Sequence, residues 1–158
     1  MTQIDRSTAL KQLYDQDFAL WVEAIAAHLK ARDTTHLDWD NLIEEVESLG
    51  KSQKKELKSR LGVLLIHILK RCYLPMPECY RGWVSTIDEQ RRELQLLLEQ
   101  SPSLRRYFVN EFDDVWVYAL RQIRKDYPGA NFPDLWQFNR DVDAILSDEF
   151  WQSSGLIS

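Results

Sequence analysis

The stretch L-G-V-L-L-I-H-I-L, from Leu61 to Leu69, is apolar on every side of a helix except at His67. Most helices in soluble domains have one apolar face and one polar face. A helix that is apolar all round is expected to be covered by protein on every side. This stretch therefore predicts the central helix of a helical fold, with one titratable ring inside it.

The composition of the whole chain favours the same fold class. Only 5 glycines and 5 prolines occur in 158 residues, too few for many short strands and tight turns. A hydrophobic content of 44% and a charged content of 28% are ordinary for a globular protein. We therefore expect an all-α, compact multihelical bundle of about five main helices with an irregular aromatic C-terminal segment. It should form a single helical domain over residues 1–158, with its core at about 14–151.

Apolar periodicity, capping residues and helix stops place the expected helices. They should run from Asp15 or Asp17 to about residue 29, then over about 38–49, 52–73, 80–100 and 102–127, with a short helix at 139–146. The first of these should bury a stripe formed by Phe18, Val22, Ile25 and Leu29. Asp38 is expected to cap the second helix, and Gly50 to end or interrupt it. The second and third helices should then pack antiparallel across a short link.

Charge and cysteine content limit the classes of function. With 20 Lys and Arg against 25 Asp and Glu, the net charge is −5, which disfavours general binding to nucleic acid or a membrane surface. The N-terminus lacks the pattern of a signal peptide, and no apolar run is long enough to span a bilayer. Two cysteines, Cys72 and Cys79, are too few for a four-ligand zinc site and are expected to stay reduced. We therefore expect a cytoplasmic protein.

Four ordered motifs resemble a known bacterial family. They are D-W-D-N-L-I-E-E-V-E-S-L-G (38–50), S-R-L-G-V-L-L-I-H-I-L-K (59–70), W-V-S-T-I-D-E-Q-R-R-E-L (83–94) and S-P-S-L (101–104). Together they are similar to domain-of-unknown-function family 29 from about residue 14 to residue 150. The resemblance implies a compact multihelical fold and no particular activity.

One set of polar residues is a candidate pocket. On the third helix, His67 shares a narrow stripe with Glu56, Arg60 and Arg71. Carboxylates with a histidine can hold a metal or act as a general acid and base. The same residues can instead form a satisfied core network that fixes the helix register. The candidate polar pocket, which also draws on the neighbouring helices, comprises Glu45, Glu47, Arg60, His67, Arg71 and Arg91.

Two further features of the sequence suggest binding surfaces. The segment Lys51–Arg60 holds five basic residues and one acidic residue, which fits either a nucleic-acid patch or a solvated helix start. Trp136 and Trp151 lie in the irregular C-terminal segment, where they can form a lid on the bundle or a partner interface.

The sequence contains no nucleotide-binding loop, no nucleophile–base signature and no cluster of metal ligands. We therefore assign no catalytic residue, metal or cofactor. The prediction is a small non-enzymatic module that binds an unknown protein partner, with a homodimer as one form. The alternative is an enzyme or a metal- or small-ligand-binding bundle with a pocket around His67. Nucleic-acid binding through Lys51–Arg60 is the third hypothesis.

Overall fold

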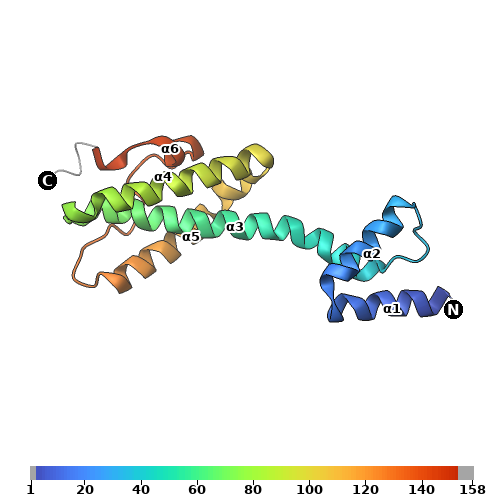
Figure 1. Cartoon of the computed structure of the whole chain (residues 1–158). Helices are drawn as coiled ribbons and strands as arrows, with labels where there is room; N and C mark the ends of the chain where they lie inside the picture. The colour runs from blue at the N-terminus through green and yellow to red at the C-terminus, as the bar shows by residue number, and fades with distance from the viewer. Residues whose placement is uncertain (1–2, 153–158) are drawn as a thin grey trace. The chain divides into compact units, whose positions relative to one another are not determined.

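A computed structural model describes residues 3–152, in which all regular secondary structure is helical (Figure 1). The helices are α1 (Gln3–Gln16), α2 (Phe18–Lys30), α3 (Trp39–Tyr73), α4 (Pro77–Gln100), α5 (Leu104–Asp126), α6 (Val142–Ser147) and a 3-10 turn, η1 (Phe150–Gln152). The all-α class, with five main helices and an aromatic C-terminal segment, is confirmed. None of the helices in the described residues is both long and apolar enough to cross a membrane.

The longest helix differs from the expectation. The sequence predicts two helices that meet near Gly50, but α3 runs unbroken through this position, and Gly50 has no positive φ. A mid-helix glycine costs about 1 kcal/mol relative to alanine, which weakens a helix without stopping it. The predicted antiparallel packing of the second and third helices is therefore wrong, because both are parts of α3.

The chain forms two compact units, Met1–Ser52 and Gln53–Ser158. We call them the N-terminal and the C-terminal unit. The helix α3 contributes its first turns to the former and the rest to the latter. Each unit has its own hydrophobic core. The single-domain expectation stays a prediction.

The N-terminal unit has a small core. Its buried hydrophobic residues in the described part of the chain are Leu10, Trp21, Ile25 and Leu37. The first of these, Leu10, belongs to α1, a helix that was not among those predicted from the sequence. Phe18, Val22 and Leu29 are exposed, so the predicted buried stripe of α2 is wrong at three of its four positions. A core of this size leaves much apolar surface of the unit uncovered.

Polar contacts define the turns of the N-terminal unit. Asp17 separates α1 from α2, and its carboxylate accepts a hydrogen bond of 3.1 Å from the amide of Leu20, as expected of an N-cap. Asp38 is fully buried just before α3. Its Oδ2 accepts hydrogen bonds from Trp21 Nε1 at 3.1 Å and from Asn41 Nδ2 at 2.7 Å. The side chain of Asp38 therefore joins α2 to α3 rather than capping the backbone of α3.

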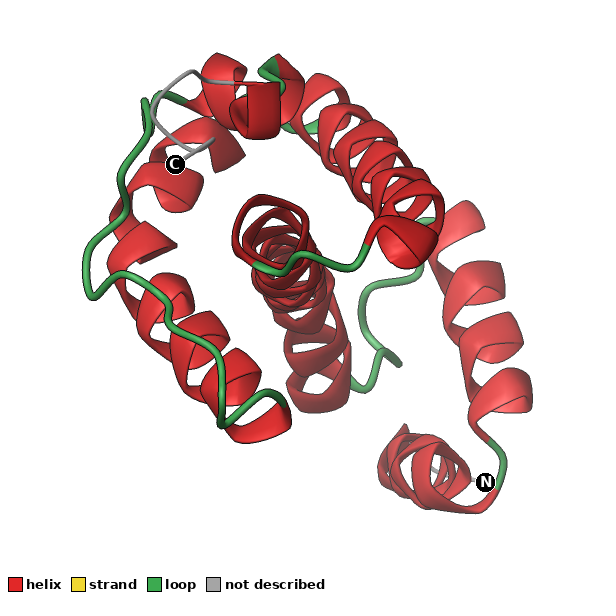
Figure 2. Ribbon diagram, turned by 90° about the vertical axis from the view of Figure 1, so that its left-hand side faces the viewer, coloured by secondary structure: helices red, strands yellow, loops and turns green. Residues whose placement is uncertain are grey.

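In the C-terminal unit, α3 lies between α4 and α5, and α6 packs beside them (Figure 2). Within the Leu61–Leu69 stretch, most residues are buried, including Leu64, Leu65 and Ile68. Val63, Ile66 and His67 are only half-buried. The stretch is therefore covered by protein on most of its circumference but not on every side, and Val63 and Ile66 lie next to a groove.

Candidate functional site

The six residues of the candidate polar pocket belong to different units. Glu45 and Glu47 lie on the first turns of α3, in the N-terminal unit, about four turns before Arg60. Glu45 is half-buried and accepts a hydrogen bond from the hydroxyl of Tyr14. This hydrogen bond is the main reason why the pKa of Tyr14 rises to about 12. Glu47 is exposed.

Arg60 and His67 share a face of α3 but bind separate partners. Arg60 donates to Glu56 at 2.9 Å and to Gln90 at 3.2 Å, and it lies 3.8 Å from Glu93. The Nδ1 atom of His67 lies 2.8 Å from the backbone carbonyl of Val63, one turn earlier. A hydrogen bond to a carbonyl requires a proton on Nδ1, so His67 acts here as a donor. The contacts of Arg60 connect α3 to α4, whereas that of His67 stays within α3.

The half-buried position of His67 gives the stability of the fold a defined dependence on pH. Burial lowers the pKa of His67 below its usual value of 6.5, and Lys70 acts in the same direction. The unfolded chain therefore binds a proton more readily, and stability falls as the pH drops below this usual value. We expect His67→Gln to reduce this loss. Urea unfolding of both proteins at about pH 7.5 and 5.5 measures this loss. If the free energy of unfolding falls by the same amount between the two pH values in the variant and in the wild type, the prediction is wrong.

The remaining two arginines contact the C-terminal segment. The guanidinium carbon of Arg71 lies 3.8 Å from the ring centre of Tyr80 and 5.6 Å from that of Trp151, which are cation–π distances. Arg91 is buried, and it donates from Nε to the carbonyl of Ile145 at 2.9 Å and from Nη2 to that of Asp148 at 2.7 Å. Both side chains thus fasten α6 and η1 to the helices α3 and α4.

Trp136 and Trp151 are both half-buried but have different neighbours. Trp136 is half-buried and lies in an aromatic cluster, in edge-to-face contact with Phe112, Trp116 and Phe150 at centroid distances of 5.4–5.6 Å. Its Nε1 donates to the carbonyl of Asn139 at 3.3 Å. Trp151 is half-buried beside Arg71. Their contacts within the chain agree with the lid interpretation, and the interface role stays a prediction.

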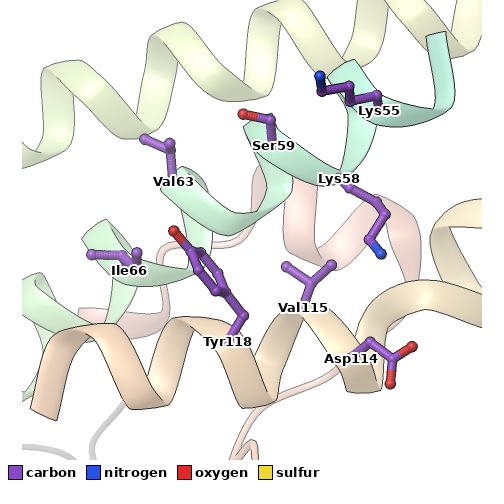
Figure 3. Close-up of a pocket in the computed structure, with 8 residues that line it drawn as sticks. All are labelled: Lys55, Lys58, Ser59, Val63, Ile66, Asp114, Val115 and Tyr118. Carbon is purple, nitrogen blue, oxygen red and sulfur yellow. The ribbon is translucent and has the colours of Figure 1, made fainter. Parts of the chain in front are cut away.

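A groove of about 470 Å³ lies between α3 and α5 (Figure 3). Its apolar lining comes from Val63 and Ile66 on α3 and from Val115 and Tyr118 on α5. The polar groups around it are Lys55, Lys58, Ser59 and Asp114. The candidate pocket residue His67 is not part of its lining. The sequence does not indicate this groove, because the groove depends on how two helices that are distant in sequence pack together.

The basic segment Lys51–Arg60 contains several residues that already have partners. Lys54 lies 5.4 Å above the ring of Tyr107, and Lys58 forms an ion pair of 3.4 Å with Glu111. Arg60 is paired with Glu56, as described above. Three of the five basic side chains are thus engaged within the chain, whereas the exposed Lys51 and Lys55 have no such contact in the described part of the chain.

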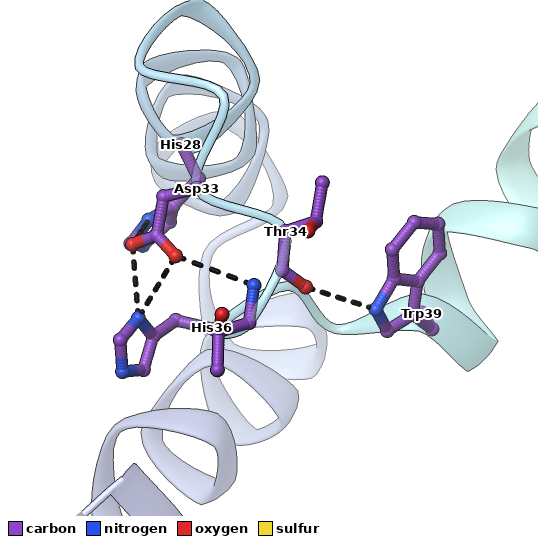
Figure 4. Close-up of polar contacts among 6 residues, drawn as sticks. His28, Asp33, Thr34, His36 and Trp39 are labelled. Atoms are coloured by element: carbon purple, nitrogen blue, oxygen red, sulfur yellow. Dashed lines mark hydrogen bonds and ion pairs between the residues drawn. The ribbon is translucent and has the colours of Figure 1, made fainter.

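The loop between α2 and α3 gathers two histidines around one carboxylate (Figure 4). The Nδ1 atoms of His36 and His28 lie 2.9 Å and 3.2 Å from Oδ2 of Asp33. The hydrogen bond from His36 is the main reason why the pKa of Asp33 is lowered. Among the described residues, no three His, Cys, Asp or Glu side chains are grouped as a metal site. This cluster fixes the loop that leads into α3.

The start of α3 exposes a row of large hydrophobic side chains, which we call the α3 stripe. It consists of Trp39, Ile43, Val46 and Leu49, with exposed fractions of 49%, 51%, 60% and 70%. Their spacing places them on one face of the helix. These residues recur at helical spacing in the sequence, a pattern that is typical of a buried face. Periodicity shows that residues share a face and does not show what covers it.

The chain matches a family model over most of its length. The model, described as a domain of unknown function, DUF29, covers residues 13–151. No curated protein and no solved structure matches the chain. The match includes α2 to α6, and with them the α3 stripe and the groove. The chain therefore belongs to the DUF29 family.

Proposed function

We propose that the protein is a non-enzymatic protein–protein interaction module whose contact surface is the α3 stripe. The single observation that carries this proposal is the exposure of four large hydrophobic side chains along one face of α3. Together they expose on the order of 400 Å² of apolar surface, which is the size of patch that often serves as a binding site on a monomer.

The distribution of exposed hydrophobic residues supports the choice of this surface. Among the residues with described side chains, 13 large hydrophobics are exposed, and 8 of them belong to the N-terminal unit. This unit contains only about a third of the chain. Besides the α3 stripe, the other four are Phe18, Leu20, Val22 and Leu29 of α2. An under-covered core of this kind gains stability when a partner removes its apolar surface from water.

A synthetic helix with leucines on one face and glutamines elsewhere tests the proposal in about 0.5 M salt, where charge is screened. We expect the Ile43→Ser/Leu49→Ser variant to bind it about tenfold more weakly than the wild type does, since two apolar anchors are lost. The readout is fluorescence anisotropy of the labelled peptide.

The matched control is the Val109→Ser/Leu135→Ser variant. It also removes two exposed hydrophobic side chains, with exposed fractions of 53% and 72%, but both lie in the C-terminal unit. It should bind the peptide as the wild type does. Equal affinities of the two double variants would contradict the proposal.

A further inference from the structure

We infer that the partner of the α3 stripe is a basic amphipathic helix, an inference that rests on the proposed function. It rests on an apolar row that lies next to an acidic row on the exposed start of α3. Recognition of this kind places the apolar face of a partner helix on the stripe and its flanking cations beside the carboxylates.

The acidic row consists of Asp40, Glu44 and Glu47, all of which are exposed. Each of them directly follows a residue of the α3 stripe, namely Trp39, Ile43 and Val46. Successive residues of a helix are about 100° apart, so the acidic row runs parallel to the stripe on one flank. Among the side chains that the structure describes, this row has one ion pair, of 3.9 Å between Asp40 and Lys11. Its carboxylates are thus available to cations of a partner.

The net negative charge of the chain is concentrated in the N-terminal unit, which carries the acidic row. Residues 1–52 hold 5 of the 20 Lys and Arg residues and 10 of the 25 Asp and Glu residues. Their formal charge is therefore −5, and that of residues 53–158 is zero. The net negative charge of the protein thus belongs to the unit that exposes the stripe. This field attracts a basic partner and speeds its association.

The same charges argue against a second copy of the chain as the occupant. Two copies that meet through their α3 stripes would bring two units of charge −5 together. Like charges across an interface reduce affinity, and salt relieves this repulsion. Salt should therefore strengthen a homodimer but weaken the complex with a basic helix. The two occupants predict opposite effects of salt.

Three labelled 18-residue peptides test the inference with the full chain. All carry leucines at the spacing i, i+3, i+4, i+7, and their other positions are filled with Lys, Gln or Glu. At low salt, we expect the Lys peptide to bind about tenfold more tightly than the Gln peptide, and the Glu peptide to bind most weakly. Raising the salt from about 50 to 300 mM should remove most of this preference.

Variants with glutamate replaced by lysine show which residues cause the preference for the Lys peptide. The Glu44→Lys/Glu47→Lys variant should lose the preference for the Lys peptide and bind the Glu peptide more tightly than the wild type does. The control variant Glu89→Lys/Glu99→Lys changes the net charge equally. Both of its positions are exposed on α4, in the C-terminal unit. It should keep most of the preference, because the effect depends on the acidic row rather than on total charge.

Failure of the inference is distinguishable from failure of the proposed function. Suppose that all three peptides bind equally, but only when Ile43 and Leu49 are present. The surface then docks helices without selecting their charge, which overturns the inference alone. If light scattering shows a dimer that salt strengthens and Leu49→Ser disrupts, the occupant is a second copy, which also overturns it. If the Ile43→Ser/Leu49→Ser variant binds the Lys peptide as tightly as the wild type does, both proposals fail.

Discussion

Replacing Arg91 with leucine is expected to lower the free energy of unfolding by about 3 kcal/mol. Arg91 donates to the carbonyls of Ile145 and Asp148, which lie at the C-terminal end of α6. The last carbonyls of a helix have no partner within it, and a cation is favourable there. Leucine would fill part of the space but leave the buried carbonyl of Ile145 and the part-buried carbonyl of Asp148 without this donor. Because α6 has only six residues, it depends on such contacts to stay folded.

Urea unfolding followed by circular dichroism measures this effect. The matched control is Arg92→Leu, the same substitution at the next position, where the side chain is exposed. This control should change the stability by less than about 0.5 kcal/mol. The prediction is wrong if the two variants unfold at the same urea concentration.

Replacing Asp38 with alanine is expected to destabilise the N-terminal unit by about 2 kcal/mol. The carboxylate is fully buried and accepts hydrogen bonds from Trp21 and Asn41. Its removal leaves the indole N–H of Trp21 buried without an acceptor. In the described part of this unit, the core has four buried hydrophobic residues, so little else offsets the loss. The effect should therefore be local to α1, α2 and the start of α3.

Hydrogen exchange measured by mass spectrometry can locate the change. Amides of α1 and α2 should exchange faster in Asp38→Ala, while those of α4 and α5 keep their protection. Asp38→Asn retains one oxygen acceptor and should keep most of the protection. The exposed neighbour Asp40, substituted by alanine, serves as the control. Unchanged protection of α2 in Asp38→Ala would contradict the assigned role of the carboxylate.

Local signals predicted much of the fold. The prolines and the apolar periodicity located α4 and α5 to within a few residues, because these signals act through the backbone of a single helix. The continuity of α3 was not predictable in this way. Whether a glycine such as Gly50 stops a helix depends on its φ, and here the backbone stays helical. The helix α1 was missed because its sequence has little apolar periodicity.

The candidate site was less predictable than the fold. The partners of Arg91 could not be predicted from the sequence, because they are backbone carbonyls more than fifty positions away. Arg91 lies between the apolar positions Ile87 and Leu94, where a buried arginine needs a partner, and the structure supplies two. The α3 stripe was visible as a pattern, but its exposure follows from the absence of a covering helix. Such an absence is a property of packing between segments.

The continuity of α3 has a consequence for how the chain folds. Starting a helix is costly because several residues must be ordered for the first hydrogen bond, whereas each further residue adds a bond of its own. The large core of the C-terminal unit stabilises the part of α3 that contains Leu61 and Ile68. Residues 39–52 can then grow from an existing helix end without a new nucleation step. The N-terminal unit, whose own core is small, thus obtains one of its three helices as an extension of its neighbour's.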